Sequence, residues 1–170
     1  GNFHFNLWNE INLQPGQVVA VSDGTTTKTH AILPLYVDGV DTVNEMVFGR
    51  AQPGSNVEVW VHGVGSLYLT ADGTGNWTAD YATIADLTPL SDGGSQQFDE
   101  DGDATGMWWT APKVQVAPED DWVQSYGIWK QNVTVTLTVE DGGVVVYSDS
   151  QPTDTNGRFF FNLWDVFDLQ

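Results

Sequence analysis

The sequence predicts an all-β fold, built as two antiparallel β-sandwich modules, one complete and the other divided between the ends of the chain. Three observations lead to this prediction. Apolar and polar residues alternate with a period of two, turn-forming residues recur about every ten residues, and the chain ends with a near-copy of its beginning. Short strands at this spacing are typical of an antiparallel sandwich.

The clearest alternation occurs in two segments rich in valine. In SNVEVWVHG (55–63), Val57, Val59 and Val61 fall on one face of a strand and their neighbours on the other. In NVTVTLTVE (132–140) the apolar residues alternate with threonine. Both segments are predicted strands, because β-branched side chains fit a pleated, half-buried surface.

Turn signals separate the predicted strands. They combine Gly with Pro, Asp or Asn, which favour tight turns. They occur at QPGS (52–55), DGTG (72–75), SDGG (91–94), EDGG (140–143) and DTNG (154–157). No segment predicts an α-helix, although IADLTPL (84–90) suggests one turn of 3₁₀-helix that Pro89 would end.

Internal repeats run through the chain. Residues 1–14 and 157–170 agree at eight positions. Three weaker similarities lie inside this period: 41–61 resembles 121–139, 70–81 resembles both 153–163 and 1–7, and 98–112 resembles 20–34. In the second of these groups, alternate apolar residues are predicted to share one face of a strand: Trp77, Ala79 and Tyr81; Phe159, Phe161 and Leu163; and Phe3, Phe5 and Leu7.

These repeats predict three parts. Residues 34–113 form a complete A-type module, residues 1–33 the back half of a B-type module, and residues 114–170 the front half of another B-type module. Pro34 and Pro112 mark the joints.

Composition excludes several classes of function. The 170 residues include 23 acidic and five basic ones, a net charge of −18, which disfavours binding to nucleic acid or anionic lipid. No apolar run is long enough to insert into a membrane. Cysteine is absent, so neither disulfides nor thiolates contribute. Abundant Gly, Asp and Trp with few Lys suit β-structure displayed outside a cell, and we expect an extracellular or cell-surface location.

The A-type module resembles the bacterial immunoglobulin-like repeats that occur in tandem in large surface adhesins and extracellular fibre proteins. The resemblance is carried by VFGRAQPGSNVEVWV (47–61), TADGTGNWTADY (70–81) and DEDGDAT (99–105). The B-type halves are only distantly similar, because Arg158 and Phe159 replace the Asn-Trp pair. The resemblance implies an immunoglobulin-like β-sandwich, an extracellular place and a mechanical role without catalysis.

The stretch FDEDGDAT (98–105) is the candidate metal site. Asp99, Asp101 and Asp103 alternate around Gly102, and hard oxygen ligands in such an arrangement suit Ca²⁺. A structural calcium ion would relieve the repulsion between the carboxylates. The alternative is a solvated acidic hairpin in a very acidic protein. A second acidic run, Glu119–Asp121, lies near the joint between modules and is a weaker candidate.

Tryptophan offers a binding alternative. Trp108 and Trp109 are adjacent, so in a strand one is expected to fill the core and the other to be exposed. Trp60 falls on the outward face of its strand. Exposed aromatic rings can stack on a glycan ligand, or they can pack against a neighbouring module.

Neither an enzyme nor a zinc site is predicted. The three histidines are far apart in the sequence and form no ligand motif, and no nucleophile motif or carboxylate pair across a cleft is recognisable. Two sequons, which begin at Asn76 and Asn132, are candidate glycosylation positions beside turns.

The divided module suggests the function. Residues 114–170 lack the final strands of a module, and residues 15–33 encode strands of that kind, so copies joined head-to-tail can complete one another by adding strands to an exposed edge. We therefore expect a structural repeat unit of an extracellular filament or long cell-surface adhesin, whose partners are copies of itself. The residues expected at the joint are Phe3, Phe5, Leu7, Trp8, Val19, Val21, Phe159, Phe161, Leu163 and Trp164.

Three arrangements of such units stay open. The units are consecutive repeats of one polypeptide, or separate chains that exchange strands, or the two halves close within one chain. The alternative function is a carbohydrate-binding β-sandwich that uses Trp60 and Trp108.

Overall fold

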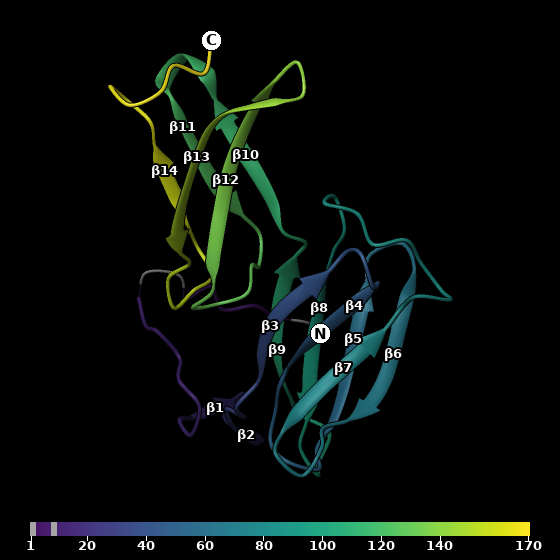
Figure 1. The fold of residues 1–170 in the computed structure, drawn as a ribbon. Helices are drawn as coiled ribbons and strands as arrows, with labels where there is room; N and C mark the ends of the chain where they lie inside the picture. The colour runs from purple at the N-terminus through teal and green to yellow at the C-terminus, as the bar shows by residue number, and fades with distance from the viewer. Residues whose placement is uncertain (1–2, 8–9) are drawn as a thin grey trace.

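A computed structural model describes residues 3–7 and 10–170 of the chain (Figure 1). Over these residues the chain forms five antiparallel sheets and no α-helix, which confirms the predicted all-β class. The described part also contains no helix of the length and apolar character needed to cross a membrane.

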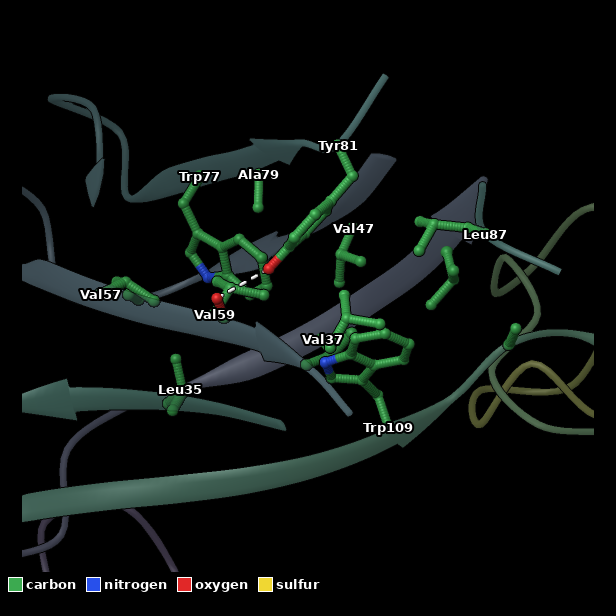
Figure 2. Packing of buried hydrophobic residues seen from close by; sticks show 14 of the residues in the cluster. Leu35, Val37, Val47, Val57, Val59, Trp77, Ala79, Tyr81, Leu87 and Trp109 are labelled. Atoms are coloured by element: carbon green, nitrogen blue, oxygen red, sulfur yellow. Dashed lines mark hydrogen bonds between the residues drawn. The ribbon is translucent and has the colours of Figure 1, made fainter. Parts of the chain in front are cut away.

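The larger core lies between two sheets, which we call the first sheet pair. One sheet has the order β3 (Tyr36–Asp41), β4 (Met46–Arg50), β7 (Asn76–Asp80); the other has the order β6 (Gly65–Thr70), β5 (Asn56–Val61), β8 (Asp92–Phe98), β9 (Ala104–Thr110). Trp77 from the first sheet and Val59 and Trp109 from the second belong to one buried cluster (Figure 2). The Tyr81 hydroxyl donates a hydrogen bond of 2.8 Å to the Val59 carbonyl and so links the two sheets (Figure 2).

The smaller core belongs to the second sheet pair. Its strands are β10 (Lys113–Ala117), β11 (Trp122–Tyr126) and β14 (Phe160–Asn162) in one sheet, and β12 (Thr134–Asp141) and β13 (Val144–Pro152) in the other. Val123, Phe159, Phe161 and Leu163 are buried in it. Side chains on β12 and β13, such as Leu137, cover this cluster only partly.

One hairpin turn occurs in both sheet pairs with the same hydrogen bonds. The N–H of Asp72 donates to the Asn76 carbonyl, and the N–H of Asp154 donates to the Arg158 carbonyl, both at 2.8 Å. Each turn has a glycine with positive φ next to a backbone carbonyl, and a Cβ on Gly157 would lie 2.1 Å from that carbonyl oxygen. The sequence similarity of 70–81 to 153–163 therefore corresponds to one turn built twice.

A second repeated feature closes each core. The N–H of Tyr81 donates to the Glu45 carbonyl, and the N–H of Leu163 donates to the Asp121 carbonyl. Both acceptor residues have positive φ, 58° and 51°. The N–H groups three and four residues after Tyr81 both donate to the Tyr81 carbonyl. The same pair of hydrogen bonds occurs at the carbonyls of Leu163 and Leu7. The shared chain path therefore extends to the N-terminal segment.

The expected 3₁₀-turn at 84–90 is wrong. The N–H groups of Ile84 and Ala85 both bond to the Tyr81 carbonyl, and the N–H of Leu87 bonds to the Glu45 carboxylate, so no 3₁₀ series continues. The 3₁₀-helix lies instead at η1 (Pro118–Asp120). There the missing N–H and fixed φ of proline suit a first helical position.

The expectation of a strand at Phe3, Phe5 and Leu7 is also wrong, since residues 3–7 carry no strand. The corresponding residues of β14 already pair with β11, so that edge is taken. The first strands among the described residues are β1 (Val18–Ser22) and β2 (Thr27–Ala31), a hairpin that lies beside the first sheet pair (Figure 1).

We predict that Tyr81→Phe lowers the free energy of unfolding by about 0.5–1.5 kcal/mol, because the hydrogen bond between its hydroxyl and the Val59 carbonyl is lost. Burial raises the pKa of Tyr81 to about 12, whereas an unfolded tyrosine has a pKa of about 10. The contribution of neutral Tyr81 is therefore complete below pH 10 and is lost as the pH rises toward 12. Urea unfolding at pH 8 and pH 11 measures both effects. The control is Tyr68→Phe at an exposed position, and equal losses in the two variants would contradict the assignment.

Candidate functional site

The edge of β12 that faces away from β13 is the main unfinished feature of the described chain; we call it the free edge. β5 pairs with β6 on one side and β8 on the other, whereas β12 pairs with β13 alone among the described residues. Unpaired N–H and C=O groups on such an edge are a template for another strand. The free edge is therefore a candidate interface.

The side chains of β12 show the same incompleteness. Val57, Val59 and Val61 of β5 are 1%, 0% and 5% exposed. The inward residues of β12 (Val135, Leu137 and Val139) are only half-buried. The second core therefore lacks cover on the side of β12. In the first sheet pair, β8 and β9 cover the core on the corresponding side of β5.

The β1–β2 hairpin turns one face toward the first sheet pair. Val19 pairs with His30 and Val21 with Lys28, so these four side chains share that face. The two valines are half-buried and line a cavity together with Lys28, Asp103 and other residues. Apolar residues of the hairpin thus lie beside acidic ones.

Polar contacts hold this face against residues 99–103, which we call the acidic turn. His30 Nδ1 lies 2.8 Å from Asp99 Oδ2, and His30 Nε2 lies 2.9 Å from Thr105 Oγ1. Lys28 Nζ lies 2.8 Å from Asp101 Oδ2 and 3.3 Å from Asp103 Oδ2. The hydrogen bond between Lys28 and Asp101 raises the pKa of the lysine and lowers that of Asp101 to about 2.

The three aspartates proposed as metal ligands do come together. Asp99, Asp101 and Asp103 each offer a carboxylate oxygen, and these oxygens lie within 4.8 Å of one another, an arrangement that could hold a metal ion. The N–H of Asp103 donates to Asp99 Oδ1 and fixes the turn. Sequence reasoning missed Lys28, which offsets part of this charge. The only available signal was its rarity, as one of five basic residues.

The second acidic run has a structural role. The Asp121 carboxylate accepts the N–H of Leu169 at 2.9 Å, and the Asp121 carbonyl accepts the N–H of Leu163 at 2.7 Å. This residue therefore closes the second core, as Glu45 closes the first.

Among the residues expected at the joint, Val19 and Val21 are half-buried, as described above, and the others differ in burial. Phe159, Phe161 and Leu163 are buried in the second core. Their counterparts Phe3, Phe5 and Leu7 are exposed, as is Trp164; Phe3 is 70% exposed where Phe159 is 8% exposed. Trp8 lies outside the described residues. The chain thus carries a second, unburied copy of a core-forming segment.

The tryptophans face as the alternation predicts. Trp109 is buried, whereas Trp108 on the opposite face is 71% exposed. Trp108 contacts Trp60 edge-on with ring centroids 5.7 Å apart, and it also contacts His62. These rings form a small aromatic group on the outer face of β5 and β9.

Both sequon asparagines are exposed. The Asn76 side chain donates to Thr74 Oγ1 at 2.7 Å, within the Asp72 turn. Asn132 has a positive φ of 54° just before β12.

Comparison with models of known protein families and with curated proteins finds no match for this chain.

We predict that Lys28→Ala speeds hydrogen exchange of the β1 and β2 amides and leaves β8 unchanged, because the ion pair with Asp101 holds the hairpin. Asp101→Asn should have the same effect. The contact should persist at neutral pH and weaken as the pH falls below about 4 toward 2, since the Asp101 pKa is depressed. Exchange measured by mass spectrometry tests this. The control is Lys113→Ala, which removes a cation over the Tyr126 ring instead. Hairpin exchange that matched this control would contradict the assignment.

Proposed function

We propose that this chain is a structural repeat unit of an extracellular filament or long cell-surface adhesin, in which neighbouring units complete each other by strand addition. In this proposal the first sheet pair is a complete immunoglobulin-like module. The second sheet pair is the front of another module, and the β1–β2 hairpin is the back of a third. The single observation that carries the proposal is the free edge of β12 above a half-covered core.

The energetics favour a partner strand over solvent. An added strand would satisfy the backbone groups of the free edge and cover Val135, Leu137 and Val139. Complete burial of a valine or leucine side chain stabilises by roughly 1.5–3 kcal/mol before entropy is subtracted. A joint that involves several such residues would resist mechanical load, which suits a fibre.

The repeated construction of the two sheet pairs is the second support. The Asp72 and Asp154 turns and the closures at Tyr81 and Leu163 use the same backbone hydrogen bonds. Such repetition is typical of tandem repeat proteins, in which each repeat contacts its neighbours. A donor at one end and an acceptor at the other give a heterologous contact, which generates a filament when it does not close.

The surface charge fits display outside a cell. A net charge of −18 keeps a crowded, elongated assembly soluble, and the absence of cysteine makes the joint independent of redox conditions. Both forms of linkage are compatible with this proposal, either consecutive repeats of one polypeptide or separate chains.

Calcium at the acidic turn is the finer part of the proposal. Ca²⁺ would be held by Asp99, Asp101 and Asp103 and would displace the Lys28 ammonium from the same carboxylates. The ion would then stiffen the turn between β8 and β9 and free the hairpin that now contacts it.

A carbohydrate-binding function is the second candidate, and the exposed aromatic group of Trp60 and Trp108 favours it. Beside these rings, Glu58 accepts hydrogen bonds from Tyr68 and Gln96. A sugar ring could stack on Trp108 while polar groups nearby bind its hydroxyls.

The filament proposal predicts concentration-dependent, end-to-end assembly of the purified chain. Sedimentation velocity should show a series of multiples of the 18.6 kDa unit, and electron microscopy should show beaded threads. Replacing Leu137 by Asp, which places a charge on the half-covered core, should abolish the threads, whereas Thr138→Asp on the outer face should not. Monodisperse monomers at every concentration, retained on a polysaccharide column through Trp108, would favour the carbohydrate function instead.

The calcium proposal predicts that Ca²⁺ raises the melting temperature of the chain and that a chelator reverses the rise. Asp101→Asn should remove the effect, and Lys28→Ala should lower the Ca²⁺ concentration needed, because the competing cation is gone. Differential scanning calorimetry with and without Ca²⁺ makes the measurement. A midpoint that does not move in either the unaltered chain or Lys28→Ala would contradict a calcium site.

A further inference from the structure

We infer that the free edge of β12 takes one particular partner, the β1–β2 hairpin of a second copy of this chain, in a single register. The inference rests on the proposed function, in which units join by strand addition. It adds which strands are donated, which residues face each other and which side chains enter the second core.

The first sheet pair provides the template, because it contains the strands that the described second sheet pair lacks. There β8 pairs with the edge of β5 opposite β6, and β9 extends the sheet beyond β8. β8 and β9 directly precede β10, the first strand of the second sheet pair. β1 and β2 directly precede β3, the first strand of the first sheet pair. The hairpin therefore has the chain position of β8 and β9, one sheet pair earlier.

Counting back along the chain matches the two hairpins residue by residue. The first residue of β3 pairs with the last residue of β4, and the first residue of β10 pairs with the last residue of β11. The first residues of β3 and β10 are therefore equivalent. Four residues before these starts lie Ile32 and Trp109. The N–H of Ile32 donates to the Gln17 carbonyl, and Trp109 pairs with Gly93. Ile32 therefore takes the place of Trp109, and Gln17 takes that of Gly93. This backbone match differs by one residue on β2 and by two on β1 from the sequence similarity of 20–34 to 98–112.

The acceptor strand is matched in the same way. The first residue of β5 pairs with the residue two positions before Asp72. In the same way, the first residue of β12 pairs with the residue two positions before Asp154. β12 thus corresponds to β5, whose residues Val57, Val59 and Val61 face Gln97, Ser95 and Gly93 of β8. Transferred to the joint, this register sets Val135 opposite the partner's Val21, Thr136 opposite the partner's Ala20, Leu137 opposite the partner's Val19, and Val139 opposite the partner's Gln17.

The side chains of the hairpin suit these positions. Val19, Val21 and Ile32 would occupy the places of Ser95, Gln97 and Trp109, all of which are buried in the first core. Apolar residues thus enter where the second core lacks cover. Lys28 and His30 would occupy the places of Thr105 and Met107, which are not fully buried, so their polar ends can still reach water.

The donated state excludes the contact seen within one chain. The face of the hairpin that would enter the second core is the face that now lies against the acidic turn through Lys28 and His30. Figure 1 shows the hairpin beside the first sheet pair and apart from β12. Donation therefore requires the hairpin to leave its own acidic turn.

Disulfide trapping tests the register, because the chain has no cysteine of its own. Ala20→Cys and Thr136→Cys, made in separate copies, alter exposed residues that would face each other on the outer side of the joint. Directly opposed residues of antiparallel strands have Cβ atoms about 4.5–5.5 Å apart, within reach of a disulfide after small shifts. Mild oxidation of the mixture should give a mixed dimer, identified by a size tag on one copy.

Matched controls move the cysteine by two residues along β12. Mixtures of Ala20→Cys with Thr134→Cys or with Thr138→Cys keep the same outward face but are out of register, and should give at least fivefold less mixed dimer. Val18→Cys with Thr138→Cys is a second in-register pair, which guards against a folding defect in the first. A synthetic peptide of residues 15–33 should compete with the mixed dimer, and the same peptide with Val19→Asp and Val21→Asp should not.

The outcomes separate this inference from the proposed function. Threads with dominant cross-linking of residues 20 and 136 support both. If threads form but an out-of-register cysteine pair gives most of the mixed dimer, or no cysteine pair cross-links, the register is overturned and the filament proposal is retained. The absence of threads and of every mixed dimer overturns both. A disulfide within single copies of the double variant Ala20→Cys/Thr136→Cys at high dilution would show closure inside one chain and overturn the inference.

Discussion

The backbone of a β-strand has two edges, and each edge needs hydrogen-bond partners when the strand covers a core. β5 meets this requirement within the first sheet pair, and its inward valines are fully buried. β12 meets it on one side only among the described strands, and its inward residues are half-buried. The core of the second sheet pair is therefore closed at the Leu163 end and open beside β12.

The two sheet pairs share their backbone hydrogen bonds more closely than their side chains. The turns at Asp72 and Asp154 agree bond for bond, although Trp77 in one corresponds to Phe159 in the other. Gly75 and Gly157 in these turns cannot be replaced without a clash, because each lies against a backbone carbonyl oxygen. Backbone geometry thus sets the repeat, and side-chain chemistry is free to differ between the cores wherever the total volume is maintained.

The features that could be predicted from the sequence are local ones. The alternation in 55–63 and 132–140 identified β5 and β12, because a half-buried strand imposes a period of two on its own residues. The proximity of Asp99, Asp101 and Asp103 followed from their spacing around one glycine. The contact of Lys28 with this turn could not be predicted in that way, since it joins residues 73 positions apart that share no pattern.

Context decided the remaining differences. Phe3 and Phe159 occupy matching places in similar sequences, yet only Phe159 is buried, because one edge of β11 accommodates one strand. A local sequence pattern cannot show which of two similar segments pairs with the edge of β11. The segment 84–90 does not form the predicted 3₁₀-turn for a similar reason, because its N–H groups donate to the Tyr81 carbonyl and the Glu45 carboxylate.

The unlike cores have a further consequence for how the two sheet pairs of one chain fold beside each other. Neighbouring repeats with identical cores are prone to swap strands during folding, and the misassembled forms are hard to undo. Here Ala79, fully buried in the first core, corresponds to Phe161 in the second. A strand exchanged between them would force a phenyl ring into the space of a methyl group, or leave a void in its place. The difference between a small and a large residue at this one position therefore disfavours exchange of these strands between the two sheet pairs.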